Sequence, residues 1–211
     1  GVADVYQRSD GTWQYDTELS ASNAGVGDQF GWSVAIAADG QTIAVGAVFE
    51  DNAAAGINMP DGNGNLNSGA VYVFARSGTT WTEQAYIKAS NTGDFDEFGH
   101  LVSLSSDGST LAVTTLYESR AARGLDGAQD NNDIDQAGAA YLFRRQGATW
   151  QQTAYIKAPN TELRDRFGRS VALSGDGKTL AVGSTDEDSA ATGIGGDQAD
   201  NSSSSSGAVY L

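Results

Sequence analysis

The 211-residue sequence contains no cysteine, one histidine, one methionine and two prolines. Without cysteine, the chain can form no disulfide, no thiol nucleophile and no cysteine-ligated zinc site. A single histidine likewise excludes a multi-histidine zinc centre. No apolar run approaches the roughly 18 residues that a membrane-spanning helix needs, so we expect no membrane insertion.

Positive charge is also scarce. The chain carries 12 Lys and Arg against 27 Asp and Glu, which gives a formal net charge of −15. Nucleic acids are bound through basic surfaces, so this balance predicts no nucleic-acid partner. An acidic, well-hydrated surface is typical of a soluble secreted protein and also suits divalent cations as counter-ions. We therefore expect an extracellular or cell-surface location.

Repetition is what the sequence has in abundance. A short motif ending in Phe-Gly recurs at residues 28–31, 96–99 and 165–168, and tryptophans recur at Trp13, Trp81 and Trp150. The tryptophans are 68 and 69 positions apart (81 − 13 = 68 and 150 − 81 = 69). This period is typical of an array of small units that bury their faces against one another.

Each repeat predicts four short strands and no helix. In the third copy, residues 170–174 alternate polar and apolar side chains, a Gly-Asp-Gly-Lys turn follows, and residues 179–183 are apolar. Further copies of the repeat continue through a long polar loop to two more strands, as at residues 69–74 and 81–88. Four antiparallel strands per repeat predict an all-β fold, a β-propeller built of four-stranded antiparallel blades, with about three blades' worth of sequence.

The repeat boundaries predict that the first and last blades are split. We divide the chain into outer strands of a split blade (1–30), two blade repeats (31–98 and 99–167), and inner strands of a split blade with a partial third strand (168–211). Such edges favour self-association, because unpaired strands invite pairing. Two copies joined head to tail in a six-bladed ring, a filament, and a piece of a longer array all remain open.

The Phe-Gly motifs, Leu-Ala-Val-Gly at residues 180–183, and Gly-Ala-Val-Tyr at residues 69–72 carry a resemblance to a known family. The chain resembles bacterial FG-GAP-like repeat proteins and is similar to the integrin α-subunit β-propeller repeats. The resemblance implies a propeller fold and, in many blades, a calcium loop between the first two strands. Here each such hairpin holds one carboxylate (Asp39, Asp107 or Asp176), too few for calcium, so these residues are expected to form turns.

The long loops between the second and third strands are the acidic parts of the repeats. Oxygen-bearing side chains are closely spaced in these loops, which allows a loop to surround a hard cation. We therefore expect candidate calcium ligands there. The candidate metal ligands are Asp61, Asn63, Asn65, Asp126, Asp130, Asp133, Asp135, Asp197 and Asp200. Hydrated turns that bind no ion are the alternative.

Two residues that follow the Phe-Gly motif are candidate ligand-binding residues. Trp32 is not matched by Trp in the other repeats, and an exposed Trp suits stacking on a sugar or anchoring of a protein. His100 occupies the equivalent position and is expected in an exposed loop. Trp13, Trp81 and Trp150 are instead expected to pack between blades.

Catalysis finds little support in the sequence. Carboxylate pairs such as Asp94/Asp96 and Asp186/Asp188 could serve glycoside hydrolysis, but a solvated acidic rim is the simpler interpretation. We predict a non-enzymatic recognition or adhesion module that presents acidic loops to a protein or glycan. The alternatives are a self-associating structural repeat and a polysaccharide-acting propeller enzyme.

Overall fold

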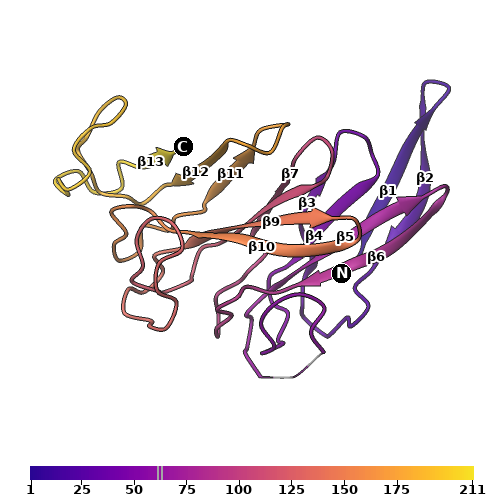
Figure 1. Ribbon diagram of the computed structural model, residues 1–211, viewed down its shortest axis with the longest axis horizontal. Helices are drawn as coiled ribbons and strands as arrows, with labels where there is room; N and C mark the ends of the chain where they lie inside the picture. Colours follow the sequence, from indigo (N-terminus) through magenta and orange to yellow (C-terminus); the bar gives the residue numbers. More distant parts are fainter. Residues whose placement is uncertain (61, 63) are drawn as a thin grey trace.

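The computed structural model describes residues 1–60, 62 and 64–211 (Figure 1). Within these residues the chain forms thirteen strands in four antiparallel sheets. None of the described chain is a helix with the length and apolar character needed to cross a bilayer. The predicted all-β fold, with antiparallel four-stranded blades, is confirmed.

The sheets follow one another along the chain. The first is the hairpin of β1 (Ala3–Ser9) and β2 (Thr12–Leu19). The second is β3 (Phe30–Ile36), β4 (Thr42–Ala47), β5 (Ala70–Ser77) and β6 (Thr80–Ile87). The third is β7 (Leu101–Leu104), β8 (Thr110–Thr115), β9 (Ala139–Gln146) and β10 (Thr149–Ile156). The fourth is β11 (Ser170–Leu173), β12 (Leu180–Ser184) and β13 (Ala208–Tyr210).

The strand register repeats from sheet to sheet. Val45 pairs with Tyr72, Val113 with Tyr141, and Val182 with Tyr210. Short hairpins join the strands at one end, and the three long loops extend from the opposite end, along the left and lower edges of Figure 1. The repeated sequence therefore encodes one structural unit, as the 68- and 69-residue spacing predicts.

The first strands of neighbouring sheets lie side by side, as expected for blades around an axis. Contacts join β3 to β7 and β7 to β11. At the hairpin that follows each first strand, the Ala38 amide donates to the Ser106 carbonyl at 3.0 Å. The Ser106 amide donates in turn to the Gly175 carbonyl at 2.8 Å. Equivalent turns of three sheets thus form a continuous chain of backbone bonds.

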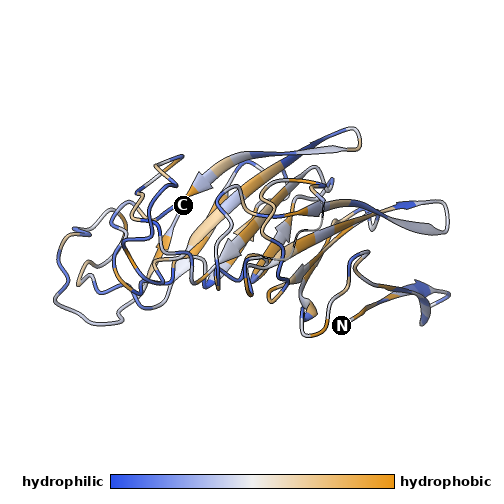
Figure 2. Ribbon diagram, turned by 90° about the horizontal axis from the view of Figure 1, so that it is seen from below, coloured by the Kyte–Doolittle hydropathy of each residue, from blue (hydrophilic) through white to orange (hydrophobic). Residues whose placement is uncertain are grey.

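The Phe of each Phe-Gly motif packs on the third strand of its own sheet. The Phe98 ring makes edge-on contacts with Tyr141 and Phe143, at centroid distances of 5.3 and 6.1 Å. Phe30 makes the same two contacts with Tyr72 and Phe74 of the second sheet, and Phe167 makes the first of them with Tyr210 of the fourth. Apolar residues gather along the strands and hydrophilic ones in the loops (Figure 2). The repeated Phe is therefore a core residue of each blade.

The three repeated tryptophans have different environments. Trp150 is buried, and its indole N–H donates to Gln84 of the preceding sheet at 2.9 Å. Trp81 donates in the same way to Asp16 at 3.2 Å. Trp13 is 69% exposed. The predicted packing between blades is confirmed for Trp81 and Trp150 and is wrong for Trp13, because none of the described strands covers that side of β2.

Close approach of neighbouring blades explains one repeated glycine. Gly138 has a φ of +77°, and a Cβ there would overlap the backbone of Phe167 in the next repeat. Gly11 has a similar φ of +82° in an open hairpin, where a Cβ would meet nothing within 4 Å. We expect Gly11→Ala to lower the free energy of unfolding by about 1 kcal/mol through backbone strain alone. Gly138→Ala should lower the free energy of unfolding at least twice as much. Urea denaturation measures both losses, and equal losses would contradict the close approach of Gly138 to Phe167.

Candidate functional site

The long loops and the loops that precede each Phe-Gly motif form one surface, called here the loop face. Among the described residues it comprises 50–60, 62, 64–68, 118–137 and 186–206 together with 20–29, 88–97 and 157–166. Backbone bonds tie the two kinds of loop together. The Phe95 amide donates to Leu66 at 2.7 Å, and the Phe98 amide donates to Ser68 at 2.9 Å. The loops are thus fixed to the sheets that carry them.

A buried ion pair begins the long loop of the third sheet. Glu118 and Lys157 are both buried, and the Lys157 ammonium donates to the Glu118 carboxylate at 2.6 Å. The Tyr155 hydroxyl donates to the same carboxylate at 2.7 Å. Burial lowers the pKa of Lys157, and the neighbouring Glu118 charge opposes that shift. The pair holds the start of the loop against β10.

An asparagine connects this pair to the preceding sheet. Asn91 follows β6, and its amide donates to Glu118 at 2.9 Å while its carbonyl accepts from Tyr141 at 2.7 Å. The second sheet has the same network, built from Asn23, Glu50, Tyr72, Tyr86 and Lys88. We call each set a Glu–Lys network. It joins the third and fourth strands of a sheet to the loops that hold the asparagine and the glutamate, so it positions the loop face on the blades.

The sequence analysis missed these networks, although the sequence carries a signal for them. Glu50, Glu118 and Glu187 recur at the repeat spacing, since 118 − 50 = 68 and 187 − 118 = 69. Lys88 and Lys157 are also 69 apart. A charged residue that recurs at the repeat period indicates a structural partner rather than a solvated surface.

The two predicted ligand-binding residues lie next to each other, with Trp32 near the start of β3 and His100 directly before β7. Trp32 is 50% exposed, as predicted, and its ring centroid is 5.6 Å from that of His100. His100 is only 7% exposed, so the prediction of an exposed loop histidine is wrong. Burial lowers its pKa, and the positive charge of Arg169 acts in the same direction. Trp32, His100 and Arg169 occupy equivalent positions in three repeats. They lie near one another because the first strands of the three sheets lie side by side.

Several of the predicted metal-ligand side chains already make hydrogen bonds with the backbone or an ion pair. Asp126 accepts from the Tyr155 amide, Asp197 from the Ala199 amide and Asp200 from the Ser202 amide. Asn65 donates to the Thr92 carbonyl, and Asp135 is paired with Arg164 at 3.7 Å. In the part of the chain that the structure describes, no three acidic or histidine side chains are grouped at metal-binding distances. Asp61 and Asn63 lie outside the described residues, and Asp130 and Asp133 are exposed.

The hairpin carboxylates form turns, as predicted. Asp107 accepts from the Ser105 hydroxyl at 2.7 Å and from the Ser109 amide at 2.9 Å. These hydrogen bonds lower the pKa of Asp107 to about 2. Asp39 and Asp176 make the equivalent bond to the amide two residues on.

The aspartate that precedes each Phe-Gly motif is buried on the loop face. Burial raises the pKa of Asp96 to about 7, and the negative charge of Glu118 adds to the shift. Burial likewise raises the pKa of Asp165 to about 6 and that of Asp28 to a lesser degree. The expectation that Asp96 belongs to a solvated acidic rim is therefore wrong.

This burial predicts a pH dependence of stability. The folded chain holds the Asp96 proton up to about pH 7, whereas the unfolded chain releases it near pH 4. The folded state therefore binds more protons between these values, and its stability falls as pH rises, by at most about 1.4 kcal/mol per pH unit from this group. We expect Asp96→Asn to flatten the decline in urea melts between pH 4 and 8. Asp10→Asn makes the same substitution in an exposed hairpin and should leave the slope unchanged. An unchanged slope in Asp96→Asn would contradict the buried, protonated carboxyl.

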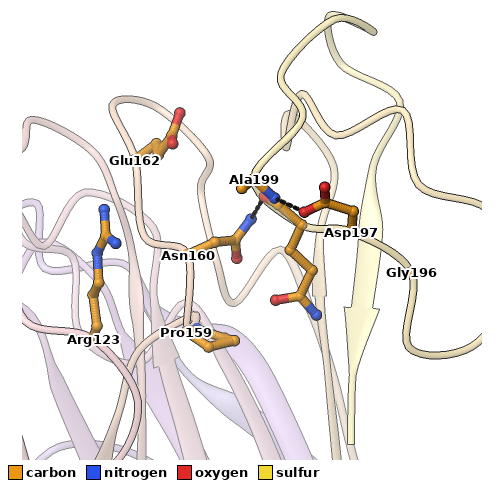
Figure 3. A pocket seen from close by; sticks show the side chains of 8 residues that line it. Arg123, Pro159, Asn160, Glu162, Gly196, Asp197 and Ala199 are labelled. Carbon is orange, nitrogen blue, oxygen red and sulfur yellow. Dashed lines mark hydrogen bonds between the residues drawn. The ribbon is translucent and has the colours of Figure 1, made fainter.

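A groove of about 480 Å³ lies between the loops of the third and fourth sheets. Arg123, Asn160 and Glu162 line one side, and residues 196–199 line the other (Figure 3). The Asn160 amide spans the groove and donates to the Gln198 carbonyl at 3.2 Å. Its walls carry both hydrogen-bond donors and acceptors, which suits a ligand rich in hydroxyl groups.

This open series of antiparallel sheets defines a β-propeller-like repeat protein, and the comparisons identify its family. The FG-GAP repeat family matches residues 13–74 and 150–211, together more than half of the chain. The chain belongs to the FG-GAP repeat family. No curated protein matches the sequence.

Among the solved structures that share the fold is a Bacteroides uniformis protein named as a candidate 6-phosphogluconolactonase, with a TM-score of 0.51 and 14% sequence identity. The similarity covers 93% of this chain and 49% of that one, so the chain spans about half the length of its structural neighbour. At this identity the likeness shows the fold alone.

Proposed function

We propose that the chain is a non-enzymatic extracellular recognition module that binds a glycan or protein through its loop face. The observation that carries the proposal is the polar groove between two anchored loops. Arg123 supplies donors, Glu162 and Asp197 supply acceptors, and the Asn160 amide ties the two loops together across the groove. A surface of this kind is ready to bind without first being ordered. Its mixed donors and acceptors favour a glycan as the ligand.

The aromatic pair at the start of the first strands, close in sequence to the loop face, supports the proposal. Trp32 is half exposed to solvent. Its ring centroid is 6.4 Å from that of Phe49 and 5.6 Å from that of His100. A fixed, half-exposed indole is a surface on which a sugar ring or an apolar side chain can stack. The burial of His100 supports binding over turnover, since the one histidine of the chain is poorly placed to exchange protons with a ligand.

A glycan array tests the proposal. We expect the wild-type protein to bind a subset of glycans, and the Arg123→Ala/Gln198→Ala variant to lose at least tenfold in affinity. Arg8→Ala/Gln14→Ala removes the same residue types from the exposed β1–β2 hairpin and should bind normally. Equal binding by both variants, or no binding by the wild type, would contradict the proposal. Release of new reducing ends from a bound polysaccharide would instead favour the enzyme.

Calcium ordering of the acidic loops is a separate part of the proposal. Its support is the density of carboxylates in the long loops, such as Asp126, Asp130 and Asp133. If calcium binds, millimolar calcium chloride should raise the melting temperature and release or absorb heat in calorimetry, and EDTA should reverse both effects. No heat and no change in melting temperature would remove calcium from the account.

A further inference from the structure

The fourth sheet contains a buried carboxylate with an incomplete set of partners. Glu187 is 2% exposed and occupies the position of Glu50 and Glu118 in the earlier sheets. Its carboxylate accepts from Asn160 at 2.8 Å, as Glu118 accepts from Asn91. Among the described residues, neither a lysine nor a tyrosine donates to it. In the second and third sheets those two donors come from the fourth strands, β6 and β10.

The edge of the same sheet is open where a fourth strand would pair. β13 pairs with β12 on one side and with no described strand on the other. Val209 is 70% exposed, whereas its equivalent Val71 is fully buried in a cluster that includes residues of the next sheet, so no described sheet covers this face of β13 either. A cavity of about 1050 Å³ lies beside this edge, lined by apolar residues such as Ile156 and Phe167 and by Glu187 itself. The edge thus combines unpaired backbone, exposed apolar side chains and a buried negative charge.

We propose that the β13 edge binds an added antiparallel strand that carries the sequence Tyr-x-Lys. The register follows from the complete sheets, where Tyr86 pairs with Tyr72 and Tyr155 with Tyr141. The added tyrosine therefore lies opposite Tyr210, and the lysine two residues on reaches Glu187. Strand addition supplies backbone hydrogen bonds for affinity, and the buried carboxylate supplies the selection for lysine.

The chain itself contains a strand that this edge should reject. In β2 the residues equivalent to Tyr86 and Lys88 are Glu18 and Ser20. Asp4 of β1 replaces Tyr72 in the same way. The β1–β2 hairpin of a second copy would therefore bring carboxylates toward Glu187 without a cation, which is unfavourable in a buried site. This argues against a two-copy ring closed by that hairpin.

Fluorescence anisotropy with three labelled peptides tests the proposal. The first is residues 149–158 (TWQQTAYIKA), the second exchanges Ile156 and Lys157 and so keeps the charge, and the third is residues 12–21 (TWQYDTELSA). We expect the first to bind the full chain at least tenfold more tightly than the other two. Binding should protect the Val209 and Leu211 amides from hydrogen exchange.

The Glu187→Gln protein, with its fold checked by circular dichroism, should lose the preference for the first peptide over the second. If the first peptide fails to bind, or all three bind equally, the proposal is overturned. If Glu187→Gln retains the full preference, the buried carboxylate is not the selecting group and the proposal is likewise overturned. None of these results depends on the glycan-binding groove.

Discussion

Glu118→Gln is expected to lower the free energy of unfolding by about 3 to 5 kcal/mol, because it leaves the buried Lys157 ammonium without a counter-charge. The amide is nearly isosteric with the carboxylate, so the loss reports charge rather than volume. Urea denaturation followed by tryptophan fluorescence measures it. Removing both charges in Glu118→Gln/Lys157→Met should recover part of the loss.

The repeats provide matched controls for this prediction. Glu50→Gln should cost as much as Glu118→Gln, because Glu50 pairs with the buried Lys88 at 2.7 Å. Glu187→Gln should cost clearly less, since no described lysine depends on it. Glu18→Gln, at an exposed position of β2, should change stability by less than about 0.5 kcal/mol. Equal costs at all four positions would contradict the Glu–Lys network.

The second large effect is expected from the core of a blade. Phe98→Ala should lower the free energy of unfolding by about 3 to 5 kcal/mol, because Phe98 is fully buried against Tyr141 and Phe143. The change removes the edge-on ring contacts and leaves a cavity between the third strand and the loop face. The same denaturation experiment gives the value.

Phe95→Ala is the matched control, three residues away in the same loop. More than half of the Phe95 side chain is exposed, so its truncation should cost less than about 1 kcal/mol. A comparable loss in the two variants would show that Phe98 does not occupy the core position assigned to it.

The repeat period made the fold predictable from the sequence. Three copies of the Phe-Gly motif at equivalent offsets fixed the unit, and alternation with Gly-containing turns indicated its strands. The turn roles of Asp107 and Asp176 were also predictable, because a single carboxylate beside glycine cannot hold calcium. These features depend on local sequence, which recurs in each repeat.

The burial of individual polar residues was not predictable in the same way. His100 and Asp96 lie in loops of polar composition, yet neighbouring repeats cover them. Trp13 has the same place in its repeat as Trp150 and is exposed, because its neighbours differ. Exposure here depends on which blade packs alongside, which no single repeat encodes. The Glu–Lys networks have the same origin, since each joins residues from two repeats.

The functional proposal rests on this arrangement. The sheets hold the loops at one end, and the Glu–Lys networks fix where the long loops of the second and third sheets begin. The groove beside Asn160 lies between the loops of the third and fourth sheets. A ligand that binds there would contact neighbouring repeats at once. Recognition by a rigid array of blades is therefore the function that this geometry favours.

The side-by-side arrangement of blades is tested most directly by a disulfide between two equivalent hairpins. A Cβ added at Gly175 would lie 3.7 Å from the Ser106 Cβ, within the usual range for a disulfide. The chain has no native cysteine to interfere. On mild oxidation, the Ser106→Cys/Gly175→Cys variant is expected to lose both free thiols while it remains monomeric. Peptide mapping should locate the new disulfide between the two introduced cysteines. A folded, oxidant-treated variant that retains two free thiols would contradict the arrangement of the blades.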